Sequence, residues 1–146
     1  MTIHRTLKPA AAAVATLLAA VLLTACLNED QQKSFDLLNQ RRVKSGRREL
    51  VVHDLAQKKA QAWAEKMARE RKMSHSNLRD GMGTCWRSLG ENVGYASSIA
   101  AVHNLWWNST PHRNNILGTQ WNGVGVGVAR ASNGQWYLAH VFVQTC

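Results

Sequence analysis

Acidic residues are scarce in this sequence of 146 residues, which has nine Asp and Glu against eighteen Lys and Arg and a formal net charge of +9. Such a basic excess favours anionic partners, among them nucleic acid, acidic lipid and cell-wall polymer, and says nothing about fold. Charged residues make up only 18% of the chain and apolar residues 45%, a composition typical of a globular and not of a disordered protein. The length suits one domain with a core of its own.

The chain also lacks a hydrophobic run long enough to span a membrane. The apolar stretch 9–25 follows a short basic start and is shorter than the roughly 20 residues that a bilayer requires. This layout is typical of a secretion signal. The stretch ends in Leu-Thr-Ala-Cys26, which resembles the lipobox of bacterial lipoproteins. We therefore expect a lipoprotein signal peptide at 1–25, lipidation of Cys26 and a mature domain at 26–146; an ordinary signal peptide with a chance cysteine is the alternative.

Cysteine is equally scarce, and three cysteines leave one unpaired in an exported protein. If Cys26 carries lipid, Cys85 and Cys146 remain, and a disulfide between them suits an oxidising compartment; two buried free thiols are the alternative. Residue 27 is leucine, whereas aspartate there signals inner-membrane retention in many Gram-negative bacteria. We expect an exported protein that is lipid-anchored in the cell envelope, at the outer membrane and facing the periplasm.

Four segments of the mature chain have helical patterns. The clearest begins at Asp54 and ends near Lys72, with alanines, Trp63 and Met67 on one face and charged residues on the other. Its small alanines predict a close approach to a neighbouring element, and Asp54 and Gln57 have the spacing of a capping box. The other helices are predicted at 28–45 (with an apolar stripe of Phe35, Leu38 and Val43), after the serine pair at 97–98, and at 111–117.

Basic residues cluster where the first predicted helix ends. Their usual meaning is a solvated helix end, where cations suit the helix dipole. Binding to anionic lipid head groups or to a cell-wall component is the sharper alternative, with the membrane as partner through Cys26; no nucleic acid partner is expected. The cluster consists of Arg41, Arg42, Lys44, Arg47 and Arg48.

Strand signals concentrate at the C-terminal end. Valine and glycine alternate over 123–128, and 136–143 is rich in strand formers. Asn133-Gly134 between them is a strong hairpin signal. With a short strand candidate at 87–95, and with 50–52 as an extended connector, the order of elements predicts an α+β fold in which four helices pack on a small antiparallel sheet.

The hairpin turn also predicts how its strands pair. A two-residue turn at 133–134 would place Val126 opposite Val141, so that one face is a core of β-branched residues. The other face would carry the glycines beside Phe142 and His140. We expect that glycine face to leave room for a helix or a ligand.

Four motifs in fixed order carry a family resemblance. They are His75, Leu-Gly-Glu-Asn at 89–92, Trp-x-Asn-Ser-x-x-His-Arg-x-Asn-Ile-Leu at 106–117, and the Gly-Val-Gly-Val strand. Together they resemble the CAP superfamily of cysteine-rich secretory, antigen 5 and pathogenesis-related-1 proteins, in its bacterial form, over residues 29–146. The resemblance implies an α-β-α sandwich around an antiparallel sheet. Proteins of this family are often non-enzymatic, and some bind sterols or fatty acids, so the resemblance implies a binding protein more than an enzyme.

The same resemblance implies a cavity lined by two histidines and two acidic residues. The matching positions are His75, His112 and Glu91, whereas Ser109 occupies the position of the second acid. Two imidazoles and one carboxylate are a common zinc set with an open position, so His75, Glu91 and His112 are candidate ligands for zinc or another divalent metal. A buried hydrogen-bonded cluster that orders the loops is the alternative.

Two classes of function follow from this cavity. The first is a binding or interaction module for a divalent metal, a lipid or an anionic ligand. The second is a metal-dependent hydrolase or peptidase that activates water. Ser109, His112 and Glu91 also contain the groups of a Ser-His-acid set, but no nucleophile-elbow motif surrounds the serine. The missing second acid favours binding, so no catalytic residue is assigned.

Overall fold

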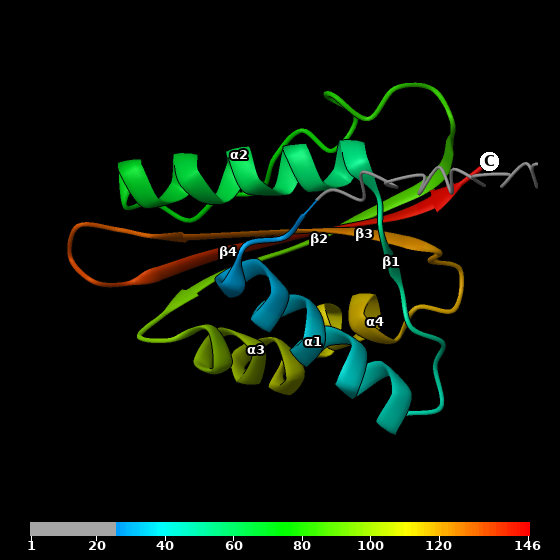
Figure 1. Ribbon diagram of the computed structural model, residues 1–146, viewed down its shortest axis with the longest axis horizontal. Helices are drawn as coiled ribbons and strands as arrows, with labels where there is room; N and C mark the ends of the chain where they lie inside the picture. Colours follow the sequence, from blue (N-terminus) through cyan, green and yellow to red (C-terminus); the bar gives the residue numbers. More distant parts are fainter. Residues whose placement is uncertain (1–25) are drawn as a thin grey trace, which may run out of the picture.

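The computed structural model describes residues 26–146, and the expected signal peptide at 1–25 lies outside the described residues. One helix covers one face of a central sheet and three cover the other, which confirms the α+β sandwich (Figure 1). No helix of the described chain is long and apolar enough to cross a membrane. The elements are α1 (Glu29–Lys44), β1 (Val51–Val52), α2 (Asp54–Glu70), β2 (Trp86–Ala96), α3 (Ile99–Asn108), α4 (Thr110–Leu117), β3 (Gly123–Arg130) and β4 (Trp136–Thr145).

The four strands form one mixed sheet in the order β1-β3-β4-β2. β4 runs antiparallel to β3 and β2, whereas β1 runs parallel to β3. The sequence predicts a purely antiparallel sheet with 50–52 as a connector. Val51 and Val52 instead pair with Gly123 and Val124 as the chain passes from α1 to α2. A pairing of two residues is too short to leave a strand signal in the sequence.

α2 packs on its face of the sheet at a distance that only glycine permits. A Cβ atom on Gly125 would lie 2.0 Å from the carbonyl carbon of Ala56, and one on Gly127 would lie 1.9 Å from the carbonyl oxygen of Ala60. No side chain fits there, so the helix backbone meets the strand backbone. The close approach predicted from the alanine face of α2 is confirmed.

The hairpin register differs by one residue from the predicted one. Val126 pairs with His140 and not with Val141. The reason is a loop of three residues where the prediction has two: Gly134 adopts a φ of +82° and donates its N–H to the carbonyl of Ala131. A shift of one residue moves every side chain of β4 to the opposite face relative to β3.

This shift changes which residues share each face of the sheet. His140 and Phe142 lie on the face covered by α1, α3 and α4, and not beside the glycines as predicted. The glycines lie instead beside Ala139, Val141 and Val143 under α2. The room predicted beside the glycines is therefore filled by a helix and not by a ligand.

The first two helices are capped by side chains. Asn28 and Gln31 form a reciprocal capping box at α1. The predicted capping box of Asp54 and Gln57 at α2 is wrong, because His53 caps that helix through its Nδ1 atom. Gln57 points to the sheet, where its amide exchanges two hydrogen bonds with the backbone of β3. The amide thus satisfies the backbone of β3 at Val126, just beyond the two residues that pair with β1.

α1 turns a mostly polar face to the core. Val43, predicted to belong to an apolar stripe, is 54% exposed, whereas Leu38 is buried as predicted. The core side of α1 also includes Ser34, Asn39 and Arg42. Polar residues can occupy such a face because each finds hydrogen-bond partners inside the fold.

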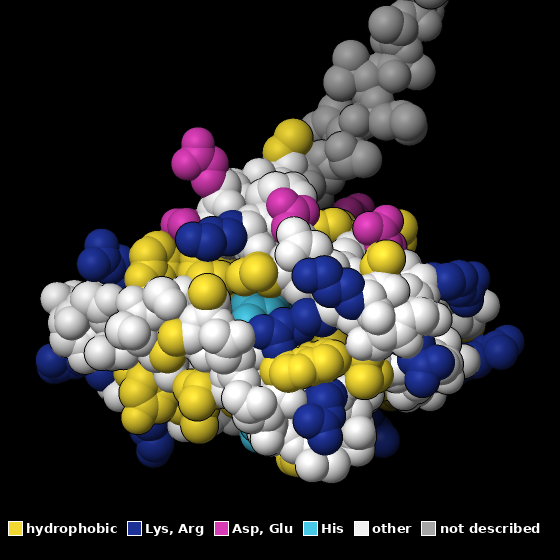
Figure 2. All heavy atoms as spheres, turned by 90° about the horizontal axis from the view of Figure 1, so that it is seen from below, with side chains coloured by type: hydrophobic (Ala, Val, Ile, Leu, Met, Phe, Trp, Pro, Cys, Tyr) yellow, Lys and Arg dark blue, Asp and Glu magenta, His cyan; other side chains and the backbone are white. Residues whose placement is uncertain are grey.

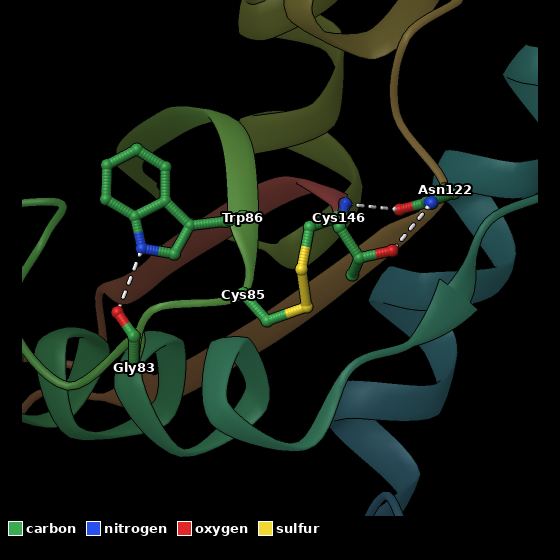
Figure 3. The surroundings of a disulfide bond; sticks show 6 residues. Gly83, Cys85, Trp86, Asn122 and Cys146 are labelled. Atoms are coloured by element: carbon green, nitrogen blue, oxygen red, sulfur yellow. Dashed lines mark hydrogen bonds between the residues drawn. A yellow bond between two sulfur atoms is a disulfide. The ribbon is translucent and has the colours of Figure 1, made fainter.

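Cys85 and Cys146 form a disulfide, as predicted (Figure 3). It joins the start of β2 to the C-terminal residue across a sequence separation of 61 residues. On the chain-entropy model a loop of this length contributes about 4 kcal/mol. Cys26 is exposed and has no disulfide partner within 26–146.

Candidate functional site

His75 lies in the loop that follows α2. The helix ends at Arg71, whose φ of +49° reverses the chain. Trp63 donates its Nε1–H to the carbonyl of Ser74 at 2.7 Å and ties the returning loop to the helix. The Nδ1 atom of His75 then lies 2.7 Å from Oε1 of Glu91 on β2. The imidazole is 63% exposed and the carboxylate only 2%, so the pair meets solvent through the histidine.

Glu91 is fully engaged by the loop that carries His75. Its Oε1 atom also accepts the backbone N–H of Ser76 at 2.9 Å, and its Oε2 atom accepts the Ser76 hydroxyl at 2.5 Å. An ionised carboxylate only accepts hydrogen bonds, so Nδ1 of His75 carries the proton and Nε2 keeps its lone pair. Within the described chain this Nε2 atom has no hydrogen-bond partner. Glu91 therefore fixes the tautomer of His75.

His112 enters the site from the other side of β2. Ser109 ends α3 and begins α4, and Pro111 stands in the first turn of α4, which places His112 on that turn. Its Nδ1 atom lies 2.7 Å from the hydroxyl of Ser109. Burial lowers the pKa of His112, and a proton on the nearby His75 would lower it further. The imidazole is therefore neutral at pH 7, and the two histidines are close enough to interact.

Two asparagines hold both halves of the site in register. Asn92 follows Glu91 on β2 and donates its amide to the carbonyl of His112 at 3.0 Å. Asn115 of α4 donates to the carbonyl of Glu91 at 3.2 Å and to Oδ1 of Asn92 at 2.9 Å. The network joins the edge strand to the short helix. The sequence analysis did not single out either asparagine, although both stand inside the quoted motifs.

The site is not assembled as a metal centre with three ligands. Among residues 26–146, no group of three or more His, Cys, Asp and Glu side chains can hold a metal ion. Glu91 orients the ring of His75, as carboxylates behind a metal-binding histidine do. Both of its oxygens already accept hydrogen bonds from His75 and Ser76. His75, Glu91 and His112 are thus not assembled as a three-ligand centre, and metal binding at this site stays a prediction.

A Ser-His-acid set is not assembled either. Such a set needs the acid and the serine on opposite nitrogens of one imidazole. Here Ser109 contacts Nδ1 of His112, whereas Glu91 contacts the other histidine, His75. The combination of Ser109, His112 and Glu91, which the sequence already disfavours, therefore has no hydrogen-bonded relay.

A family model described as "CAP: Cysteine-rich secretory protein family" matches residues 35–146, which is most of the chain. The chain belongs to the CAP family. A comparison with curated proteins gave no match.

Solved CAP-like structures share the fold. An outer surface protein from Borrelia burgdorferi superposes with a TM-score of 0.73 at 18% identity, over 81% of this chain and 94% of that one. An extracellular protein containing an SCP domain from Bacillus anthracis gives 0.69 at 25% identity, over 80% of this chain and 40% of that one. A cysteine-rich secretory protein from Staphylococcus aureus gives 0.67 at 19% identity, over 80% and 39%. This chain spans about two fifths of the last two proteins.

The CAP domain also buries two histidines that the sequence analysis missed. His103 of α3 and His140 of β4 are both fully buried, and each places its Nε2 atom within hydrogen-bond distance of the hydroxyl of Ser34 on α1. No signal in the sequence marks His103, because a lone histidine on a helix resembles a surface residue. The predicted register of the hairpin also placed His140 on the wrong face.

The basic cluster at the end of α1 is divided by the fold. Arg42 is buried, and its guanidinium donates to the carbonyls of Arg48, Ile116 and Gly118. It therefore joins α1 to the end of α4 and is not available to an anionic ligand. Of the cluster, Lys44, Arg47 and Arg48 are exposed and Arg41 is partly exposed. On the face formed by α1, α3 and α4, Lys and Arg side chains lie among hydrophobic ones (Figure 2).

Proposed function

We propose that this CAP domain is a binding module that holds its ligand between the imidazoles of His75 and His112, and that it is not a hydrolase. The observation that carries the proposal is the engagement of Glu91. Both of its oxygens accept hydrogen bonds from His75 and Ser76, so the carboxylate orients an imidazole and is not free to activate water. The exposed Nε2 atom of His75 is left to meet a ligand.

The charge of the site limits the chemistry of that ligand. His112 is neutral at pH 7, since burial lowers its pKa and a proton on His75 would lower it further. A neutral imidazole offers either a lone pair or one N–H group. The site thus suits a hydrogen-bonding group or a metal ion presented by a partner better than it suits a bare anion.

Zinc chloride is a direct probe of this arrangement. Calorimetric titration at pH 7.5 is expected to give a binding heat in the wild type, and His75→Ala or His112→Ala should each abolish it, because each removes one of two ligands. The heat should weaken in acid, because a protonated imidazole has no lone pair for the metal. Ser109→Glu, which restores the second acid of the family, should strengthen binding.

His53→Asn is the matched control, since this histidine caps α2 on the other layer of the molecule. It should leave the zinc heat unchanged. Absence of heat in both the wild type and Ser109→Glu at pH 7.5 would contradict the proposal. Equal heats in the wild type and both alanine variants would contradict it as well.

The second part of the proposal concerns location. We infer that the protein is exported and held in the cell envelope by lipid on Cys26, at the outer membrane. Supporting observations are the lipobox-like sequence, the exposure of Cys26, and the similarity to an outer surface protein and an extracellular protein. Cys26→Ser should release the protein from membranes or leave it unprocessed. If the variant fractionates and migrates like the wild type, Cys26 is not the anchor.

The fold restricts how an anchored domain meets the bilayer. Only Leu27 and Asn28 separate Cys26 from α1, so the tether spans no more than about 10 Å. The exposed basic residues lie at the opposite end of α1, about 24 Å away for sixteen residues. They reach anionic head groups only when α1 lies along the membrane plane. Binding of the Cys26→Ser protein to anionic vesicles should then fall steeply with salt and weaken in Arg47→Gln/Arg48→Gln; equal binding to neutral vesicles would contradict this orientation.

A further inference from the structure

Three elements meet at one buried hydroxyl. Oγ of Ser34 on α1 lies 2.9 Å from Nε2 of His103 on α3 and 2.8 Å from Nε2 of His140 on β4. All three side chains are fully buried. This contact therefore fastens α1 and α3 to each other and to an inner strand of the sheet.

A serine hydroxyl carries one hydrogen, so it donates to one imidazole and accepts from the other. One histidine must therefore be protonated at Nε2, and the other at Nδ1. The Nδ1 atoms of His103 and His140 are both buried and have no hydrogen-bond partner within residues 26–146. The cluster thus holds two neutral imidazoles in opposite tautomers, with one unpaired donor and one unpaired acceptor.

The surroundings of the pair oppose any positive charge. Burial, and to a smaller extent the charge of Arg41 on α1, lower the pKa of His103 to about 3. Burial also holds the pKa of His140 well below its ordinary value, and His103 adds to the effect. The charged or titratable groups that act on the pair are thus Arg41 and the two histidines themselves. None of them carries a negative charge that could compensate a protonated ring. On the other sides the pair faces uncharged neighbours, with Trp106 of α3 and Phe142 of β4 against the rings and Val126 and Asn92 opposite His140 in the sheet.

Trp106 connects this cluster to the candidate site. The centroid of its indole lies 4.7 Å from that of His140 and 5.3 Å from that of His103. It also stacks with His112, at 6.5 Å between ring centroids. Its Nε1–H donates to the carbonyl of Val93 on β2 at 2.9 Å. One indole therefore contacts the buried pair and forms a wall beside His112.

We propose that Ser34, His103 and His140 form an acid-sensitive latch, which holds α1 and α3 on the sheet at neutral pH and releases them in acid together with the Trp106 wall beside His112. The latch does not depend on the ligand proposed above, and a negative zinc titration leaves it standing. Protonation of either imidazole removes a hydrogen-bond acceptor and adds a charge that the closed core does not compensate. The open state takes up those protons in water.

The expected size of the effect follows from proton linkage. A histidine that stays neutral when closed and titrates at about 6.5 when open shifts the opening equilibrium about 30-fold between pH 7.5 and pH 5. Two such histidines shift it about a thousandfold. The acid dependence should therefore correspond to nearly two protons.

Native-state amide hydrogen exchange on the Cys26→Ser protein measures this opening. After correction for intrinsic exchange rates, protection of the buried amides of α1 and α3 should fall about a thousandfold from pH 7.5 to pH 5. At pH 5 these amides should exchange much faster than those of α2, because the latch opens without releasing the opposite layer. Amides of α4, next to the Trp106 wall, should follow α1 and α3.

Glutamine variants separate titration from packing. His103→Gln/His140→Gln keeps an amide near each Nε2 position but cannot titrate, so the acid-dependent loss should disappear. Each single variant should retain only about 30-fold, which decides the matter if the double variant does not fold. His53→Asn, on the α2 layer, should keep the full effect. An unchanged acid dependence in the single variants would overturn the latch, as would equal protection of α1, α3 and α2 at both pH values.

Discussion

The two faces of the sheet are packed by opposite means. Under α2 the contact consists of glycine against alanine, with backbone close to backbone and, within residues 26–146, no buried histidine or arginine. Under α1, α3 and α4 the core contains large side chains such as Trp106 and Phe142, together with buried Ser34, Arg42, His103 and His140. The first face depends on shape and on uncharged hydrogen bonds such as those of Gln57 with β3. The second depends on hydrogen bonds whose strength varies with protonation, so acid should weaken one layer and spare the other.

The largest expected effect is the acid sensitivity of the polar face. Both buried histidines bind protons less readily when folded, so their stabilising contribution is complete above pH 6.5. It is lost as pH falls toward the pKa of His103, about 3. Between pH 7.5 and 5 the free energy of unfolding should fall by about 2 kcal/mol for each histidine. Urea unfolding should show this loss in the wild type and not in His103→Gln/His140→Gln; equal loss in both proteins would assign it to other groups.

The glycine face should be intolerant of a single methyl group. Gly127→Ala places a Cβ atom against the backbone of α2, where no flexible side chain can move aside. We expect a loss of about 3 kcal/mol that does not change with pH. Gly81→Ala is the control, because it has a positive φ but open space around the new atom, and should lose only about 1 kcal/mol. Similar losses in the two variants would show that α2 can shift away from the sheet.

Arg42 should contribute far more to the stability of the fold than its neighbours in the basic cluster. Arg42→Met removes the donor for three backbone carbonyls, two of which lie at the end of α4. Thermal unfolding should report a loss of about 2 kcal/mol. Arg47→Met, on the surface, should change stability by no more than about 0.5 kcal/mol. If Arg42→Met left the stability unchanged, water would have to satisfy the three carbonyls as well as the guanidinium does.

The smallest effect on stability is expected at the candidate site on β2, where His75 contacts Glu91. His75→Ala removes one of the three donors to Glu91, while Ser76 keeps the other two. The expected loss is about 1 kcal/mol, since one buried acceptor is left partly unpaired. A loss above about 3 kcal/mol, measured by urea unfolding with or without zinc, would make His75 part of the core scaffold and not a ligand-contacting residue.

The contrast between the faces also explains which parts could be predicted. The face of α2 was visible in the sequence because alanines at helical spacing and a glycine-valine alternation are periodic signals. Ser34 and Arg42 stand at helical spacing with Leu38, but they are polar, and like His103 they look like surface residues. The hairpin was found but its register was wrong, since Asn133-Gly134 suits a two-residue and a three-residue loop alike. The one-residue error in register placed His140 on the wrong face of the sheet.

The candidate site was predictable in its members and not in its connections. His75, Glu91, Ser109 and His112 were located by motif, and the structure hydrogen-bonds them as two pairs, His75 with Glu91 and Ser109 with His112. Which nitrogen meets which oxygen depends on loop geometry at Arg71 and Ser109, which no spacing rule encodes. For that reason the sequence alone could not show that His75, Glu91 and His112 are not joined as three ligands in this arrangement, and metal binding stays a prediction.

A long-range proton–nitrogen NMR spectrum of the histidine rings, followed from pH 7.5 downward, tests the contrast most directly. At pH 7.5 one of His103 and His140 should carry its proton on Nε2 and the other on Nδ1, and His75 should carry its proton on Nδ1. The buried pair should stay neutral in the folded protein well below pH 6.5, losing its folded signals before it gains charge. Identical tautomers for the buried pair, or smooth protonation of either ring near its ordinary pKa of about 6.5 while the protein stays folded, would contradict the account.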